Sequence, residues 1–200
     1  DEAKIPEIAE KHHINELLAR ILLNRNIDTD EKIEKFLYPK LEDLNSPYLF
    51  KDMEIAVECI EKAIEQKEKI TIYGDYDVDG ITSITVLKRF LDEIGAIADY
   101  YLPNRLSEGY GLNNSALEEI RARGTKLLIT VDCGISAYEE IEYAKSLGLD
   151  VIVTDHHECP EKLPEAIAVI DAKRPDNTYP FNSLAGVGVS FKLVQALCQK

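Results

Sequence analysis

The sequence is short of positive charge, of long apolar runs and of paired cysteines. Its 200 residues hold 23 Lys and Arg against 37 Asp and Glu, which gives a formal net charge of −14. The basic footprint that usually marks a nucleic-acid-binding protein is therefore missing, although bound cations would neutralise part of the acidic excess. The apolar runs are too short to span a bilayer, which predicts that no membrane is involved.

The cysteines and the start of the chain narrow the class of protein further. Cys59, Cys133, Cys159 and Cys198 show no C-x-x-C spacing, and no secretory signal precedes them. This pattern predicts reduced thiols in a cytoplasmic protein. The chain begins with Asp1 rather than Met, so we expect a piece of a longer protein.

Apolar periodicity predicts two regions, a small helical region over residues 1–48 and a larger α/β domain over residues 49–200. Because strands alternate with helices in the larger domain, we expect an open, mainly parallel sheet with helices on both faces. A composition of 45% hydrophobic and 30% charged residues is enough for a proper core. The expected strands cover 69–74, 98–103, 126–131, 150–154 and 166–170. Capping boxes predict helix starts at 28–31, 115–118 and 136–139.

Acidic or histidine clusters follow three of the predicted strands. They are Asp75-Asp77-Asp79 after 69–74, Asp132 after 126–131, and Asp155-His156-His157 after 150–154. Because the carboxyl ends of parallel strands meet at one edge of a sheet, the three clusters should lie together. Clustered carboxylates with imidazole suit a divalent cation such as Mn²⁺. The sequence therefore predicts a metal-dependent phosphoesterase.

Charge repulsion gives the first cluster a reason to hold a cation. If the segment stays extended, Asp75, Asp77 and Asp79 point to the same side, and three such carboxylates repel one another unless a cation lies among them. Gly80 would then open a helix whose N-terminus can hold a phosphate. A solvated acidic turn is the alternative, and the EF-hand pattern is not met.

The histidine pair divides naturally between two tasks. Adjacent residues at a strand end point in different directions, so one imidazole can bind metal while the other faces the substrate. The Asp155 carboxylate would orient a metal-ligating imidazole by accepting a hydrogen bond from its other ring nitrogen, as carboxylates do around metal sites. His12 and His13 lie in an amphipathic helical stretch, and we interpret them as ordinary surface histidines.

Other candidates are weaker. Arg105 suits phosphate recognition only slightly better than a plain surface role. Gly186-Val187-Gly188 could hold a phosphate, and Cys133 is interpreted as a small buried residue beside the site. Asp132 could cap the next helix, although Ser136 fits that task better. For Lys173, Arg174, Arg121 and Arg123 we favour a solvated surface role over phosphate contact.

The ordered motifs resemble a known family. GDYDVDG, VDCGI and DHH, in this order and spacing, resemble the DHH phosphoesterase superfamily. YLPNRLSEGYGLN, AKRPDNTYPF and LAGVGVSFKLVQAL are similar to its RecJ-like branch of single-stranded-DNA exonucleases.

The resemblance implies a two-manganese site, with Mg²⁺ as the alternative ion, which hydrolyses single-stranded DNA from its 5′ end in repair and recombination. Its implied metal ligands are Asp77, Asp79, Asp132 and His156, with Asp75 in support. Asp132, His156 and His157 would be catalytic, with Asp132 as a bridging carboxylate, His157 on the scissile phosphate and Arg105 on the DNA backbone. The implied partners are C-terminal domains of the same protein and a helicase or single-strand-binding protein.

Three departures from the family qualify this expectation. Tyr73 stands where the pyrophosphatase branch has a metal-ligating His, and Asp171-Ala172 stands where the RecJ-like branch has Asn-Pro. A further ligand Asp and the following domains are not found before Lys200, so we expect the chain alone to be weak or inactive. Two alternatives stay open: a phosphoesterase for pyrophosphate, oligoribonucleotides or cyclic dinucleotides, and a metal-stabilised scaffold.

Overall fold

A computed structural model describes residues 2–106 and 108–200, and the chain divides into two compact units, residues 1–45 and 46–200. The first unit is helical. Its helices are α1 (Ile5–Lys11), α2 (Glu16–Asn24) and α3 (Asp30–Leu37), with single turns η1 (Glu2–Lys4) and η2 (Leu41–Asp43). They pack around a small apolar core made of Ile5, Ile8, Ala9, Ala19, Leu22 and Ile33.

His12 differs from its predicted surface role. It is 7% exposed, and its two ring nitrogens lie 2.9 Å from an Asp30 oxygen and 3.1 Å from a Glu34 oxygen. The ring therefore joins the end of α1 to α3. The capping box predicted at 28–31 is also wrong, because Thr29 is the residue whose side chain accepts from the Lys32 amide at the start of α3.

The second unit is an open, five-stranded sheet in which every strand pair is parallel, in the order β2-β1-β3-β4-β5. This confirms the predicted fold class. After the single turn η3 (Pro47–Leu49), its helices are α4 (Met53–Glu65), α5 (Val78–Glu93), α6 (Asn114–Ala122), α7 (Tyr138–Ser146) and α8 (Gly186–Leu197). Its strands are β1 (Lys69–Gly74), β2 (Ala98–Tyr101), β3 (Thr125–Val131), β4 (Asp150–Thr154) and β5 (Ala168–Ile170).

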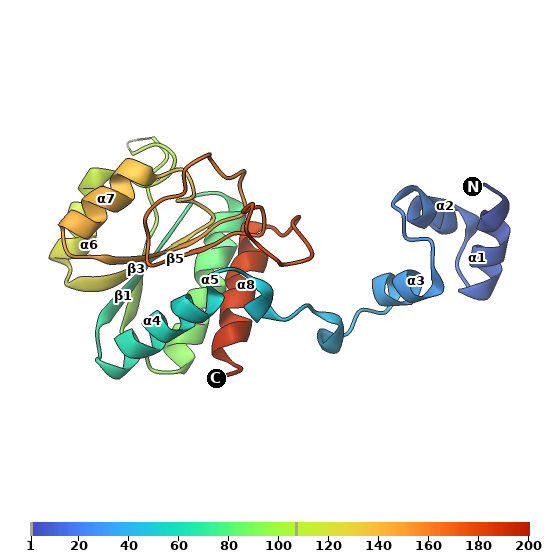
Figure 1. Ribbon diagram of the computed structural model, residues 1–200, viewed down its shortest axis with the longest axis horizontal. Coiled ribbons are helices and arrows are strands. Elements are labelled where there is room, and N and C mark those ends of the chain that lie inside the picture. The colour runs from blue at the N-terminus through green and yellow to red at the C-terminus, as the bar shows by residue number, and fades with distance from the viewer. Residues whose placement is uncertain (1, 107) are drawn as a thin grey trace. The chain divides into compact units, whose positions relative to one another are not determined.

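Helices cover both faces of the sheet, as predicted (Figure 1). Side chains of a strand alternate between the faces, so Ile70 and Ile72 join one core while Tyr73 joins the other. The first core is closed by α4, α5 and α8, and the second by α6 and α7. The strand ends are thus fixed between two packed layers.

Two other predicted helix starts are wrong. Helix α6 begins after Asn113, whose side-chain oxygen accepts from the Ala116 amide at 2.8 Å, so the helix starts before Ser115. Helix α7 begins after Ala137 with no side-chain cap bond, so Ser136 does not cap it.

Candidate metal centre

The three predicted clusters follow β1, β3 and β4, which are neighbours in the sheet. The order reverses at β1, because β2 lies on one side of β1 and β3 on the other. In open parallel sheets, ligands bind beyond the carboxyl ends of the strands at such a reversal. The topology therefore places Asp75, after β1, beside Asp132, after β3.

The first cluster is a turn and a helix start, not the extended segment that was predicted. Strand β1 ends at Gly74, and Asp77 is the N-cap of α5, where its Oδ1 accepts from the amides of Asp79 and Gly80 at 2.8 and 3.0 Å. Gly80 packs so closely that a Cβ there would lie 2.2 Å from the Asp75 carbonyl oxygen. The start of α5 is thus capped by the chain itself, which corrects its predicted phosphate-binding role.

His156 links the clusters. Its Nε2 lies 3.0 Å from Asp132 Oδ1 and 3.5 Å from Asp79 Oδ2. In the described part of the chain, two groups of side chains bring ligand atoms within 4.8 Å of one another, and both groups contain Asp132. The groups are Asp132, His156 and His157, and Asp75, Asp77 and Asp132.

Asp155 holds the histidine segment in place. Its buried carboxylate accepts from the amides of Ile135, His156 and His157, at 2.9, 2.7 and 3.2 Å. Its Oδ1 also lies 2.7 Å from His157 Nδ1. Burial opposes the charged ring of His157, but the hydrogen bond and the charge of Asp155 outweigh it and raise the pKa of His157. This leaves Nε2 of His157 as the ring nitrogen not directed at Asp155.

Helix α8 holds Asp79. The amides of Gly186 and Val187 donate to Oδ2 and Oδ1 of Asp79, both at 2.7 Å. These amides start the helix, where carboxylates are favoured by the helix dipole. The sequence left a phosphate as a weak possibility for this glycine segment. In the structure the amides of Gly186 and Val187 instead donate to the Asp79 carboxylate.

Two carboxyl groups of the site have raised pKa values and buried oxygens without hydrogen-bond partners. Burial, followed by the charges of Asp79 and Asp77, raises the pKa of Asp132 to about 7. Burial also raises the pKa of Asp75. One oxygen of each of these two carboxyl groups is buried and makes no hydrogen bond to any residue described. The His156 nitrogen near Asp132 is within ion-pair distance but outside hydrogen-bond geometry.

Such orphaned oxygens fit a divalent cation, because a cation supplies the positive partner that the fold withholds. The donor set of carboxylates and imidazole is the kind that Mn²⁺ accepts. The residues present therefore fit the metal that the sequence predicted.

Arg105 lies beside this cluster. It is exposed, and its guanidinium carbon lies 5.2 Å from the centre of the Tyr76 ring. Its charge lowers the pKa of Asp75, against the larger effect of burial. Sequence reasoning missed Tyr76, although its place between Asp75 and Asp77 in the motif was a usable signal.

Tyr110 is a second residue that was missed. Its ring meets the His157 ring edge-on at 6.3 Å between centroids. Burial and the nearby carboxylates raise the pKa of its hydroxyl, so it stays neutral. No spacing or composition signal in the sequence distinguished it from the other tyrosines.

The weaker basic candidates are engaged elsewhere. Lys173 pairs with Glu158 at 2.9 Å. Arg174 is buried against Asp52, which corrects its predicted solvated role. The Arg121 guanidinium donates to the carbonyl of Leu147. These contacts support structural roles and not phosphate binding.

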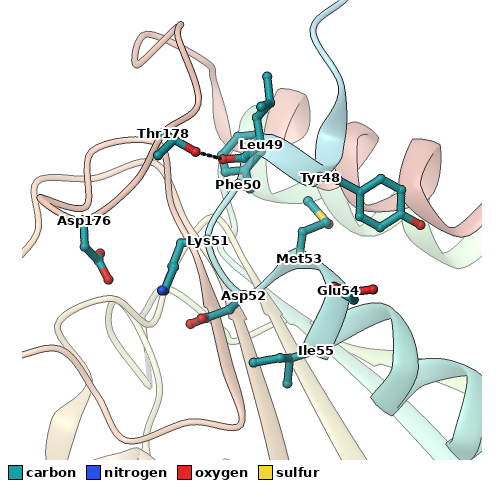
Figure 2. A pocket seen from close by; sticks show the side chains of 10 residues that line it. All are labelled: Tyr48, Leu49, Phe50, Lys51, Asp52, Met53, Glu54, Ile55, Asp176 and Thr178. Atoms are coloured by element: carbon teal, nitrogen blue, oxygen red, sulfur yellow. Dashed lines mark hydrogen bonds between the residues drawn. The ribbon is translucent and has the colours of Figure 1, made fainter.

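A cavity of about 440 Å³ lies apart from the clusters (Figure 2). Figure 2 shows Lys51, Asp52 and Thr178 at its wall, near the start of α4. The Asp52 carboxylate accepts hydrogen bonds from the Arg174 guanidinium and from the Val169 amide. Because none of the clustered candidates lines this cavity, we place the functional site at the strand ends.

Among the described residues, no helix has the length and apolar character needed to cross a membrane.

Curated proteins named RecJ are similar to this chain. The RecJ single-stranded-DNA-specific exonuclease of Bacillus subtilis is 48% identical over 197 residues, which cover 98% of this chain and 25% of that protein. The RecJ exonuclease of Escherichia coli is 38% identical over 184 residues, covering 90% of this chain and 31% of that protein. This chain therefore spans about a quarter to a third of these relatives.

Solved structures agree with the fold. RecJ of Thermus thermophilus in complex with Mn²⁺ matches all of this chain and 27% of that chain, with 28% identity and a TM-score of 0.76. An exonuclease RecJ bound to manganese matches 75% of this chain and 38% of that chain, with 36% identity and a TM-score of 0.68.

The model of the DHH family, N-terminal domain, matches residues 69–200. The matched stretch begins with β1 and includes all three strand-end clusters and helix α8. Since it covers well over half of the chain, the protein belongs to the DHH family.

Proposed function

We propose that this chain is part of a metal-dependent exonuclease that hydrolyses single-stranded DNA from its 5′ end. The observation that carries the proposal is the buried Asp132 carboxyl group, which both candidate ligand groups share. The RecJ relatives, which are named for single-stranded DNA, supply the substrate class.

The ligands proposed for Mn²⁺, or for Mg²⁺ in its place, are Asp75, Asp77, Asp79, Asp132 and His156. When bound, a pair of such ions lowers the pKa of water and stabilises the charge of a phosphodiester under attack. The chain itself positions two of these carboxylates without the metal. Asp77 is held as the N-cap of α5, and Asp79 accepts hydrogen bonds from the first amides of α8. Asp132, common to both groups, is the proposed bridging carboxylate.

Two side chains are proposed to meet the phosphate. His157, whose ring is oriented by the Asp155 carboxylate, would donate from Nε2 to a phosphate oxygen. Arg105, held above Tyr76, would bind the DNA backbone through its guanidinium. The guanidinium of Arg105, and the His157 ring whose charged form Asp155 favours, would offset part of the acidic excess at the point where a polyanion must approach.

The wider role is proposed from the relatives. We infer that the intact protein acts in DNA repair and recombination in the cytoplasm, with its own C-terminal domains and a helicase or single-strand-binding protein as partners. We also infer that residues 1–48 form a helical region separate from the phosphoesterase domain of residues 49–200.

The test is Mn²⁺-dependent hydrolysis of a 5′-phosphorylated single-stranded oligonucleotide. This chain is compared with a version that continues past Lys200 to the length of the relatives, and each is paired with an Asp132→Ala variant. We expect mononucleotides from the longer version, none from its variant, and little from this chain alone. Mn²⁺-dependent hydrolysis that survives Asp132→Ala would refute the proposed site.

The net charge of −14 favours a second candidate, a phosphoesterase for pyrophosphate, oligoribonucleotides or cyclic dinucleotides. A longer version that ignores DNA but hydrolyses one of these would establish that function and refute the exonuclease.

A further inference from the structure

The connection from β2 to α6 carries Arg105 and is built around one carboxylate, that of Glu108. Its Oε1 accepts from the Tyr101 hydroxyl at 2.7 Å, and its Oε2 accepts from the Asn104 amide at 2.7 Å. The Glu108 amide returns a bond to the Asn104 carbonyl at 2.8 Å. The backbone on both sides of Arg105 is therefore tied together and tied to the end of β2.

The connection also contacts a pair of stacked tyrosine rings on β1 and β2. The buried Tyr73 ring of β1 stacks on the Tyr101 ring at 5.4 Å between centroids. The Tyr73 hydroxyl donates to the Gly111 carbonyl at 2.8 Å. Tyr73, which stands where a related branch has a metal-ligating His, thus anchors the loop. Through the Tyr101 hydroxyl and the stacked Tyr73 ring, the Glu108 carboxylate is therefore linked to β2 and β1.

Glu108 lies outside the candidate metal centre. It belongs to neither candidate ligand group. The Asn104 amide, and next the Tyr101 hydroxyl, hold the pKa of Glu108 below its usual value. The side chain is therefore an anion whose described bonds all serve the connection itself.

We propose that Glu108 is a positioning residue for the substrate, which fixes the turn so that Arg105 stands over Tyr76 and meets the phosphate. The proposal rests on the proposed function, because it assigns Arg105 to a phosphate of the DNA. Glu108 acts on binding through Arg105 and leaves the metal centre unchanged.

The test is a double-mutant cycle in the longer version of the protein, with Mn²⁺ and a 5′-phosphorylated single-stranded oligonucleotide. Glu108→Ala raises KM about tenfold, which corresponds to about 1.4 kcal/mol, with kcat and Mn²⁺ affinity close to wild type. Glu108→Gln keeps one acceptor oxygen, so its KM should lie between those of wild type and Glu108→Ala. In an Arg105→Ala background, Glu108→Ala adds nothing further, because a residue that acts through another has no effect once its partner is gone.

Glu118→Ala is the matched control. Glu118 also accepts from a tyrosine hydroxyl, that of Tyr143, at 2.6 Å, but it lies on α6 and not in the Arg105 turn. We expect its KM to equal that of wild type. A Glu108→Ala variant with unchanged KM, or one whose effect adds in full to that of Arg105→Ala, would overturn the proposal.

Binding separates this proposal from the proposed function. Fluorescence anisotropy with the same oligonucleotide measures Kd without hydrolysis. If wild type binds but does not cleave, the exonuclease function fails, while a weaker Kd for Glu108→Ala that is absent in the Arg105→Ala background still supports the positioning role. If wild type neither binds nor cleaves the oligonucleotide, both proposals fall.

Discussion

Replacing Gly186 with Ala tests how closely helix α8 is fitted to the candidate metal centre. A Cβ at Gly186 would lie 2.6 Å from Asp132 Oδ1 and 2.8 Å from both Cβ and Cγ of Asp132. To restore an ordinary contact of about 3.5 Å, the carboxyl group must retreat by roughly 0.7–0.9 Å. Asp132 has little freedom to do so, because it is 2% exposed and its amide donates to the Thr154 carbonyl.

The cost should fall on function and not on folding. A site tolerates errors of about 0.5 Å, and a misplacement of about 1 Å costs on the order of 100-fold in rate. Ala usually stabilises a helix by about 0.5–1 kcal/mol relative to Gly, while overpacking costs about 1–3 kcal/mol. We therefore expect Gly186→Ala to fold, with a melting temperature lowered by a few degrees, but to lose most Mn²⁺ affinity and up to about 100-fold in kcat/KM.

Gly188→Ala is the internal control, a little further along the same helix. A Cβ there first meets the far end of the flexible Leu184 side chain, at 3.2 Å. We expect unchanged Mn²⁺ affinity by isothermal titration and an equal or higher melting temperature. If Gly186→Ala binds Mn²⁺ as wild type does, or if both variants lose it equally, the reasoning about the Asp132 contact is refuted.

Three further predictions follow from contacts described above. Burial raises the pKa of Asp171 from 3.8 to about 7 in the folded protein, so the unfolded chain loses this proton first and stability falls as the pH rises from about 4 to about 7. Over this range the melting temperature of the metal-free protein should fall more steeply than that of Asp171→Asn, and parallel curves would contradict this. Asp155→Asn replaces the carboxylate that holds the backbone of the proposed ligand His156, so it should weaken Mn²⁺ binding about 10- to 100-fold in a titration; equal affinity would show that this support is dispensable. His12→Phe should destabilise the 1–45 unit by about 1 kcal/mol in hydrogen exchange while Mn²⁺ affinity stays unchanged; faster exchange throughout 46–200 would contradict a local effect.

The fold followed closely from sequence because its signals are local. The runs around Ile72 and Ile152 are apolar, short and followed by polar residues, which is the pattern typical of buried parallel strands. The helix start at Asp77 was also predictable in principle, since an Asp before an apolar periodic stretch favours an N-cap. Interpreting that segment as extended overlooked this signal, and the correction changes how the first cluster converges.

Other features depended on partners far away in the chain. The Gly186 amide and Asp79 are 107 positions apart, and His12 meets Asp30 across 18 positions. Nothing in the local pattern around Gly186 indicates that its amide serves a carboxylate and not a ligand. Such pairings are set by the packing of α8 on α5, which a single sequence does not encode as a local preference.

The hydrogen bonds from α8 to Asp79 also have a consequence for the order of folding and metal binding during synthesis. A chain emerging from the ribosome presents Asp75 through His156 well before Gly186, so a nascent chain carries its candidate ligands without the amides that hold Asp79. Domains fold as units once enough of the chain has emerged. We therefore expect cation binding to wait until α8 docks, so ribosome-arrested chains that stop short of Gly186 should bind Mn²⁺ more weakly than chains that extend beyond α8.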